Sequence, residues 1–386
     1  MFTITSNIVT PDGVLTNGAL TVNDEGLIGE ITERRSSAPR SGDIDAAGFL
    51  ALPGFIDLHV HGGGGADFMH GTPEATRQVA RTHARFGTTG MLATTITASR
   101  EDTDRAIEAA RQVIEVGPGK GEARLLGIHL EGPYICPTRR GAQPEAFIRL
   151  PDAKELAHWI ELSGRTIKQI TLAPEREGAE AVIKLAREAG IVVSLGHTDA
   201  TADEVCKAID WGVTQSTHTF NAMRGLHHRE PGTVGAVLTQ PKIVAEVIAD
   251  GVHLHPMIVR LIVAAKGVGG AVLITDAMEG SAMPDGEFTL GGQTTYVRSG
   301  TASFADGTLA GSVLTMNRAF INVRRFADVS VPEAARLSSA NAARQLGISE
   351  WCGELAPGKA ADIVILHPET GEVEWTIVGG RVAYRR

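Results

Sequence analysis

The sequence has few cysteines and no long apolar run, and its first residues do not have the pattern of a signal peptide. Only three of 386 residues are cysteines, Cys136, Cys206 and Cys352, and none stands in a Cys-x-x-Cys pair. This scattered set argues against a disulfide framework and favours a reducing compartment. No apolar stretch reaches the roughly 18 residues of a membrane-spanning helix, and the first five residues lack the basic start of a signal peptide. We therefore expect a cytoplasmic protein with no membrane partner.

Positive charge is also scarce. The chain has 36 Lys and Arg against 45 Asp and Glu, which gives a formal net charge of −9. A nucleic-acid-binding protein should carry a basic face, so this balance argues against one. A small anionic ligand stays possible, because one arginine can dominate the field of a single pocket.

The two ends of the chain have β character. Residues 1–52 hold three strand patterns, at 2–9, 18–22 and 27–31, and the tail holds three more, at 362–367, 373–378 and 381–384. Hairpin edges need a partner, and pairing the head with the tail would supply one. We predict one small β-sandwich domain built from residues 1–52 and 348–386.

Between these ends, apolar strand patterns alternate with helical patterns, and glycine is abundant: its 45 residues are about 12% of the chain, against an average of about 7%. The strand patterns lie at 54–61, 88–96, 124–130, 167–173, 191–196, 215–219, 243–248 and 271–275. Helical patterns lie at 74–86, 102–116, 152–163, 179–189, 202–211, 256–266, 314–326 and 332–346, with Ser99 and Thr201 as N-caps.

Eightfold strand–helix alternation predicts a (β/α)₈ TIM-like barrel over residues 53–347. An open doubly wound sheet is the competing α/β fold. It ranks second because the first strand is not followed by a Gly-x-Gly-x-x-Gly fingerprint.

Polar residues follow the strand patterns where a barrel places its active site. They are His59 and His61 on strand one, Glu131 on strand three, His197 on strand five, His218 on strand six and Asp276 on strand eight. His59 and His61 project the same way, because side chains two apart share a face of a strand. Each residue alone is more often a solvated polar group. Together they predict a site for a borderline metal such as zinc or iron.

The residues around these positions resemble the amidohydrolase superfamily and, within it, the N-acetylglucosamine-6-phosphate deacetylases. The first segment, GFIDLHVHG at 54–62, marks only the superfamily, whereas HLEGP at 129–133 and THTFNAM at 217–223 are specific to the deacetylases. The resemblance covers nearly the whole chain. It continues through the segments at 195–198, 229–232, 248–253, 275–278 and 309–312.

The resemblance implies roles for particular residues. Glu131, His197 and His218 match the ligands of one metal; His59 and His61 match the ligands of a second ion that only some members hold, with Glu131 bridging. Asp276 matches the residue that accepts the proton of water and delivers it to the leaving amine. One or two divalent ions per subunit, zinc or iron, are therefore expected.

The resemblance also implies a phosphosugar site. Arg229 matches a phosphate-binding arginine that reaches across from the partner subunit of a homodimer. The other matching positions are His253, Asn221, Ala222, Leu309 and Gly311. Gln143 stands where some members have a histidine that contacts the acetyl carbonyl. It can donate a hydrogen bond but carries no positive charge. We expect His227, His228, His83, His158 and His367 to lie outside the metal site.

The implied reaction is hydrolysis of N-acetyl-D-glucosamine 6-phosphate to D-glucosamine 6-phosphate and acetate, in amino-sugar catabolism or cell-wall sugar recycling. Three alternatives stay open at this point. They are deacetylation of the galactosamine epimer, another amidohydrolase reaction such as cyclic-amide hydrolysis, and a non-catalytic scaffold on the same fold.

Overall fold

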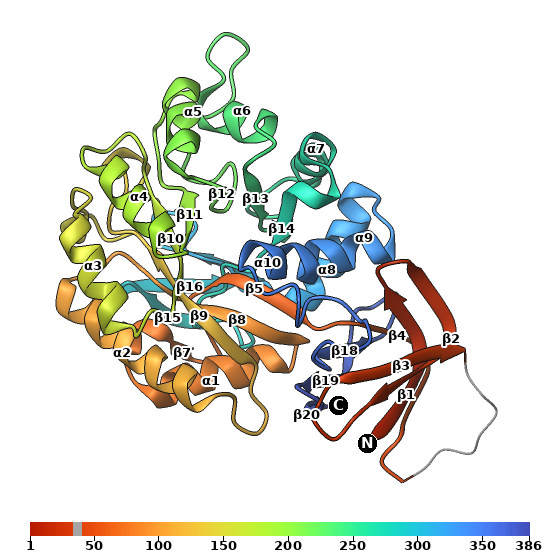
Figure 1. The fold of residues 1–386 in the computed structure, drawn as a ribbon. Helices are drawn as coiled ribbons and strands as arrows, with labels where there is room; N and C mark the ends of the chain where they lie inside the picture. Colours follow the sequence, from red (N-terminus) through yellow and green to blue (C-terminus); the bar gives the residue numbers. More distant parts are fainter. Residues whose placement is uncertain (34–40) are drawn as a thin grey trace.

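A computed structural model describes residues 1–33 and 41–386 of the chain. The segment 34–40, which belongs to the predicted first part of the small β-domain, lies outside the described residues. Figure 1 shows a ring of strands surrounded by helices, with a separate sheet at one side that holds both termini.

Eight parallel strands form the barrel and confirm the sequence prediction. They are β5 (Phe55–Val60), β8 (Thr88–Thr95), β9 (Arg124–Glu131), β10 (Ile167–Leu172), β11 (Val192–Leu195), β12 (Gln215–Ser216), β13 (Val244–Val247) and β14 (Ala271–Leu273). Each pairs with the next along the chain, in the order β5-β8-β9-β10-β11-β12-β13-β14. Every residue of β5 and β8 is buried, as expected for strands covered on both faces.

The barrel closes between its first and last strands without a continuous ladder. The main-chain N–H groups of His61 and Asp276 donate to Ala277 and His59, 2.9 and 2.8 Å away. Below this point the buried carboxylate of Asp57 accepts from the hydroxyl of Thr275 at 2.5 Å and from its N–H at 3.2 Å. A side chain thus satisfies groups that a ladder would otherwise pair.

Helices cover the outside of the ring (Figure 1). They are α1 (Pro73–Ala84), α2 (Arg100–Val116), α3 (Ala153–Leu162), α4 (Ala179–Glu188), α5 (Ala202–Trp211), α6 (Gly232–Thr239), α7 (Pro256–Lys266), α8 (Met316–Ala327), α9 (Val331–Ala335) and α10 (Asn341–Gln345). Ser99 and Thr201 cap α2 and α5 as predicted. The predicted helix at 332–346 is interrupted by a π-helical turn, η5 (Arg336–Ala340). The sequence analysis did not anticipate α6.

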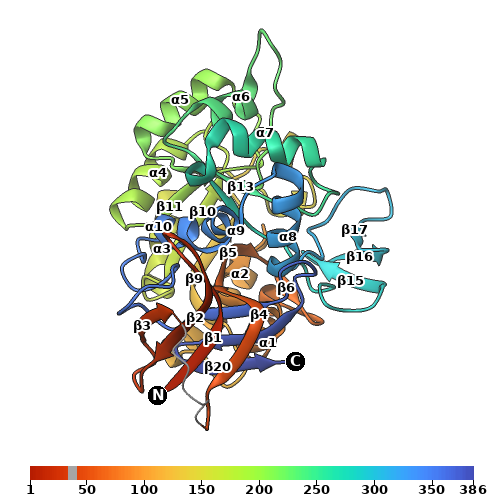
Figure 2. The ribbon, with the colours of Figure 1, turned by 90° about the vertical axis from the view of Figure 1, so that its right-hand side faces the viewer.

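The chain ends form one seven-stranded mixed sheet (Figure 2). Its order is β20 (Arg381–Arg385), β19 (Val373–Val378), β18 (Ile363–Leu366), β4 (Ile44–Pro53), β1 (Phe2–Thr10), β2 (Gly13–Val22) and β3 (Ile28–Glu33). Head and tail therefore pair as expected, through the antiparallel β4–β18 ladder. All seven strands belong to one hydrogen-bonded sheet, and residues from both ends of the chain share one apolar cluster. The boundaries at residues 52 and 347 stay a prediction.

A second small sheet, which the sequence analysis missed, follows strand eight. It comprises β15 (Gly286–Leu290), β16 (Gln293–Arg298) and β17 (Thr301–Ser303) and projects from the barrel mouth (Figure 2). Shorter elements are β6 (Gly62–Gly63), β7 (Ala66–Asp67), η1 (Phe68–His70), η2 (Pro137–Arg139), η3 (Glu145–Phe147) and η4 (Val268–Gly270). Within the described residues, no helix is long and apolar enough to cross a membrane.

Candidate active site

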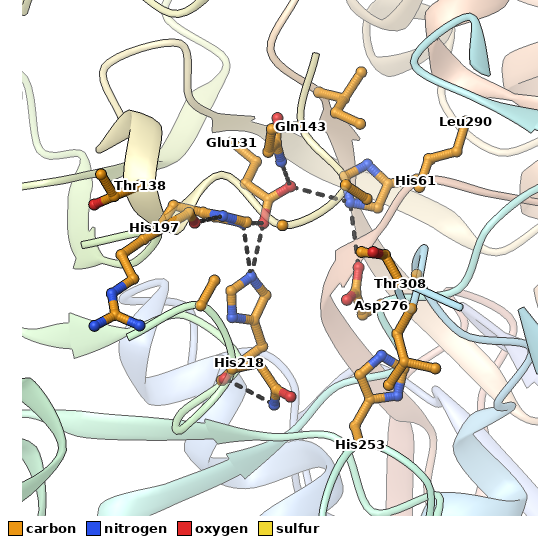
Figure 3. A pocket seen from close by; sticks show the side chains of 18 residues that line it. His61, Glu131, Thr138, Gln143, His197, His218, His253, Asp276, Leu290 and Thr308 are labelled. Carbon is orange, nitrogen blue, oxygen red and sulfur yellow. Dashed lines mark hydrogen bonds and ion pairs between the residues drawn. The ribbon is translucent and has the colours of Figure 1, made fainter. Parts of the chain in front are cut away.

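A cavity of about 400 Å³ opens at the carboxyl ends of the barrel strands. Figure 3 shows the side chains of His61, Glu131, His197 and His218 pointing toward one another on its floor. The cavity lies where a barrel places its catalytic groups, and its volume suits a small-molecule ligand.

Glu131, at the end of β9, joins the polar side chains of the floor. Its Oε1 lies 3.1 Å from Nε2 of His218 and 3.2 Å from Nε2 of His197. The same oxygen lies 3.4 Å from Nε2 of His59, and Oε2 lies 3.3 Å from Nε2 of His61. One carboxylate therefore faces four imidazole nitrogens; the bridging role that the resemblance implies for Glu131 stays a prediction.

Asp276 belongs to the same cluster. Its Oδ1 lies 3.2 Å from Nε2 of His61 and 3.4 Å from Nε2 of His59. The side chains divide into two candidate ligand sets, Glu131 with His197 and His218, and Asp276 with His59 and His61. In each set one ligand atom per residue lies within 4.8 Å of the others. The two sets sit side by side, with Glu131 between them.

The backbone is strained where three of these residues leave their strands. His197, His218 and Asp276 have φ values of 48°, 30° and 51°, in the left-handed region that non-glycine residues rarely adopt. Such conformations cost roughly 1–3 kcal/mol each and persist where the surroundings enforce them. Here they occur at strand ends, where they direct the side chains toward the cavity floor.

The donor set fits a divalent metal. Nδ1 of His197 donates to the carbonyl of Arg139 at 2.9 Å, and Nδ1 of His59 donates to Glu246 at 3.1 Å. These bonds direct each Nε2 toward the carboxylates, where the neutral imidazole presents its lone pair. Nε2 of His218 and Nε2 of His197 are only 3.0 Å apart, a separation that a shared cation would stabilise. Hydrogen-bonded imidazoles combined with carboxylates are the ligands that zinc and iron accept.

Charges alternate across the floor, and this arrangement shifts pKa values. Burial disfavours the charged form of His61, but its hydrogen bonds to Asp276 and Glu131 raise its pKa to about 9. Burial likewise opposes ionisation of Asp276, yet the adjacent His59 and His61 lower its pKa to about 2. The same balance holds the pKa of Glu131 well below its ordinary value. Without a cation, protons on the histidines balance the carboxylates.

The predicted substrate-binding residues mostly line the cavity. His253, Asn221, Ala222, Leu309 and Gly311 do so. Burial opposes the charge on His253, but its bond from Nδ1 to Asp250, 2.7 Å long, raises its pKa. The imidazole of His253, whose protonated form Asp250 thus favours, lines the cavity beside Asp276 (Figure 3).

Gln143 also lines the cavity, but its amide is already engaged. Its Nε2 donates to Oε2 of Glu131 at 2.5 Å, and its Oε1 accepts from the N–H of Thr97 at 2.7 Å. Gln143 thus holds the carboxylate of Glu131 in place. Its contact with an acetyl carbonyl stays a prediction.

The structure does not bring Arg229 to the cavity of its own chain. Arg229 is exposed on the loop before α6, which protrudes beyond α5 in Figure 1, and its guanidinium faces His228 at 2.8 Å. From this position Arg229 does not contact a ligand in the cavity of its own chain. The contact with phosphate in the cavity of a partner subunit, which the resemblance implies, stays a prediction.

Sequence reasoning missed several residues around the site. Glu246 lies inside an apolar strand pattern, where a lone carboxylate should have signalled a buried polar contact. Ile96 and Leu290 form an apolar wall near Gln143, and Leu290 belongs to the unanticipated β15. No sequence pattern pointed to Leu290.

The other histidines lie outside both ligand sets. His83 is buried against the carbonyl of Gly62, whereas His158 is exposed and pairs with Asp104. His227 and His228 lie on the exposed Arg229 loop, and His367 lies in the tail sheet region. His129, which the sequence analysis did not single out, is buried beneath the site between Thr94 and Thr171.

Comparisons with known proteins agree with this geometry. A model of the amidohydrolase family matches residues 50–383. An N-acetylglucosamine-6-phosphate deacetylase of Bacillus subtilis (strain 168) is 41% identical over 98% of this chain and 95% of its own length. An N-acetylgalactosamine-6-phosphate deacetylase of Escherichia coli O157:H7 is 40% identical over 82% of this chain and 83% of its own.

Solved structures give the same result. The N-acetyl-D-glucosamine-6-phosphate deacetylase of Mycobacterium smegmatis, as an aspartate-to-alanine variant in complex with N-acetyl-D-glucosamine 6-phosphate, superposes with a TM-score of 0.92 at 33% identity. It covers 99% of both chains. The Thermotoga maritima enzyme superposes with a TM-score of 0.88 at 36% identity, over 99% of both chains. The resemblance drawn from the sequence is confirmed: the chain belongs to the amidohydrolase family, within the branch of the N-acetylglucosamine-6-phosphate deacetylases.

Proposed function

We propose that the protein hydrolyses N-acetyl-D-glucosamine 6-phosphate to D-glucosamine 6-phosphate and acetate. The observation that carries this proposal is the position of Glu131, within 3.1–3.4 Å of four histidine Nε2 atoms at the barrel mouth. Relatives and solved structures with that named activity support the substrate. Amino-sugar catabolism or cell-wall sugar recycling is the proposed setting.

Divalent metal, zinc or iron, is part of the proposal. Glu131, His197 and His218 would hold one ion, and His59 and His61 would hold a second with Glu131 between them. Bound metal lowers the pKa of water toward about 7 and polarises an amide carbonyl.

Asp276 supplies the proton transfer. Its low pKa keeps it ionised at neutral pH, so that it accepts a proton from the attacking water. Water adds to the carbonyl carbon, and Asp276 then delivers the proton to the amine nitrogen as the C–N bond breaks. Acetate and the free amine leave. Gln143 keeps the Glu131 carboxylate in place throughout.

Phosphate recognition has two proposed sources. His253, with its raised pKa, and Asn221 lie in the cavity of the same chain. Arg229 would come from the partner of a homodimer, because it is exposed in its own chain. Among the described residues, no carboxylate lies within ion-pair distance of its guanidinium, which faces His228. Its planar fork suits a phosphate dianion. A cytoplasmic setting is proposed too, since Cys136, Cys206 and Cys352 are unpaired.

The test is an acetate-release assay with purified protein whose metal content has been measured. We expect turnover of N-acetylglucosamine 6-phosphate, its loss after chelation, and its recovery with zinc or iron. Absence of acetate release from metal-replete protein would refute the proposal.

Deacetylation of N-acetylgalactosamine 6-phosphate is the second candidate, favoured by the 40% identity with the E. coli relative of that name. The two substrates differ in one hydroxyl configuration. A higher kcat/KM for the galactosamine epimer in the same assay would make it the preferred substrate.

A further inference from the structure

One buried carboxylate contacts both ligand sets from beneath. Glu246, in the middle of β13, is completely buried. Its Oε2 lies 3.1 Å from Nδ1 of His59 and 3.1 Å from the main-chain nitrogen of His218. Glu246 therefore contacts one residue of each set, on the side away from the cavity.

The other oxygen of Glu246 is held by two amides. Oε1 accepts from Nε2 of Gln169 and from Nε2 of Gln215, both at 2.7 Å. The direction of these bonds is fixed further out: Oε1 of Gln169 accepts from Gln215 at 2.9 Å, and Oε1 of Gln215 accepts from Gln345 at 2.9 Å. The amides cannot turn without breaking this chain of bonds.

This arrangement determines the hydrogen on Nδ1 of His59. The main-chain N–H of His218 can only donate, so Oε2 of Glu246 is an acceptor. Nδ1 of His59, at the same oxygen, then carries a hydrogen, and in the neutral imidazole that a metal requires, the lone pair is on Nε2. That Nε2 faces Glu131 and Asp276 at 3.4 Å. The tautomer that can bind a metal is thereby imposed from outside the ligand set.

We propose that Glu246 is a positioning residue that fixes the metal-binding tautomer of His59 and so maintains occupancy of the second metal position. This inference rests on the two-ion site of the proposed function. His197 does not depend on Glu246, because its Nδ1 is held by the carbonyl of Arg139. The ion of the first set should therefore depend on Glu246 less than the second ion does.

The test variant is Glu246→Gln. In the wild type, one carboxylate oxygen accepts from His59 and His218 and the other accepts from Gln169 and Gln215. A glutamine has only one acceptor oxygen, so one of these two pairs of donors would face an N–H group instead. Loss of such a second partner typically weakens metal affinity 10–100-fold. The matched control is Glu155→Gln, which changes a buried carboxylate bonded to Tyr134 and Arg149, outside the site.

The experiment titrates metal-free protein with zinc against a competing chelator and counts ions per subunit. We expect two ions in wild type and in Glu155→Gln, and a second ion bound 10–100-fold more weakly in Glu246→Gln, with the first changed less than threefold. Unchanged second-ion affinity in Glu246→Gln would overturn the inference. So would a wild-type protein that binds one ion and still releases acetate, although the proposed function would then stand.

A second measurement needs no folded Glu246 variant. In zinc-loaded wild type labelled with ¹⁵N-histidine, long-range nitrogen–proton NMR reports which ring nitrogen of each histidine carries hydrogen. We expect His59, assigned by a His59→Asn variant, to be protonated at Nδ1 and metal-bound at Nε2. A metal-bound or unprotonated Nδ1 would overturn the inference.

Discussion

Replacement of Asp276 by asparagine separates proton transfer from metal binding. The amide has nearly the same shape as the carboxylate, and Asp276 is only 8% exposed, so the surrounding packing stays intact. The amide cannot accept the proton of the attacking water. Glu131, His197 and His218 are untouched, so the first ion should stay bound.

The expected loss of rate follows from the role of Asp276. General acid–base catalysis contributes about 10²–10⁴-fold, which corresponds to roughly 3–5 kcal/mol of transition-state stabilisation. We expect Asp276→Asn to lose nearly all turnover, with a fall in kcat in that range and little change in KM, because Asp276 acts on the reacting atoms and not on the phosphate.

The stability of the metal-free protein gives a second, independent measure of the Asp276 charge: its contribution to the free energy of unfolding. The pKa of Asp276 is lowered from 3.8 to about 2 in the folded protein, which corresponds to roughly 2 kcal/mol. A lowered pKa stabilises the fold above pH 3.8, and this contribution is lost as the pH falls through about 2. Metal-free Asp276→Asn should therefore be less stable than wild type at pH 6, with the difference shrinking in acid.

Three measurements on one preparation complete the test. They are acetate release, ions per subunit, and the unfolding midpoint in denaturant at pH 6 and below pH 4. An active Asp276→Asn protein with full metal content would refute the assignment of Asp276 as the proton carrier. A variant that has lost the ion of the set formed with His59 and His61 would show that Asp276 acts by holding metal instead.

Three further predictions concern other parts of the site. Arg229→Ala should raise KM for the phosphorylated substrate about 10–100-fold, since one hydrogen bond to a charged group contributes roughly 1.5–3 kcal/mol, and leave KM for plain N-acetylglucosamine unchanged; equal effects on both substrates would contradict a phosphate contact. Chelator-treated protein should lose stability as the pH rises from about 6.5 through about 9, because the raised pKa of His61 stabilises the fold only while the imidazole is protonated; a melting temperature that climbs over this range would argue against that charge balance. Leu290→Ala should widen the cavity at its apolar wall near Gln143 and so raise kcat/KM for an N-propionyl substrate relative to the N-acetyl substrate. The truncation should cost about 2–5 kcal/mol in stability. An unchanged acyl preference would place the acyl group elsewhere.

Some features could not be predicted from sequence because no local pattern specifies them. Helix α6 begins after Pro231 and contains Gly232, Gly235 and β-branched residues, which have weak helix propensity. All its residues but the last are buried, so tertiary packing stabilises the helix. Strand β4 carries Asp45, and Gly48 at positive φ, and it forms because β1 and β18 pair with it from either side.

The sequence by itself determined the barrel and the chemical types at its strand ends. The period and length of an apolar run can be read within a short window of sequence, so the eight strands could be identified without knowledge of the fold. The same windows gave the polar residues at the strand ends: His59, His61, Glu131, His197, His218 and Asp276. The family resemblance followed from the same segments.

Only the tertiary structure decided how these residues meet. Strand register and the left-handed turns at His197 and His218 bring histidines from the ends of three strands onto the two oxygens of Glu131. The left-handed turn at Asp276 brings its carboxylate to His59 and His61. The same closure puts Glu246 beneath His59 and leaves Arg229 outside the cavity. Such contacts join residues up to 218 positions apart, as between Asp57 and Thr275, and they depend on closing the whole ring, which no local sequence pattern encodes.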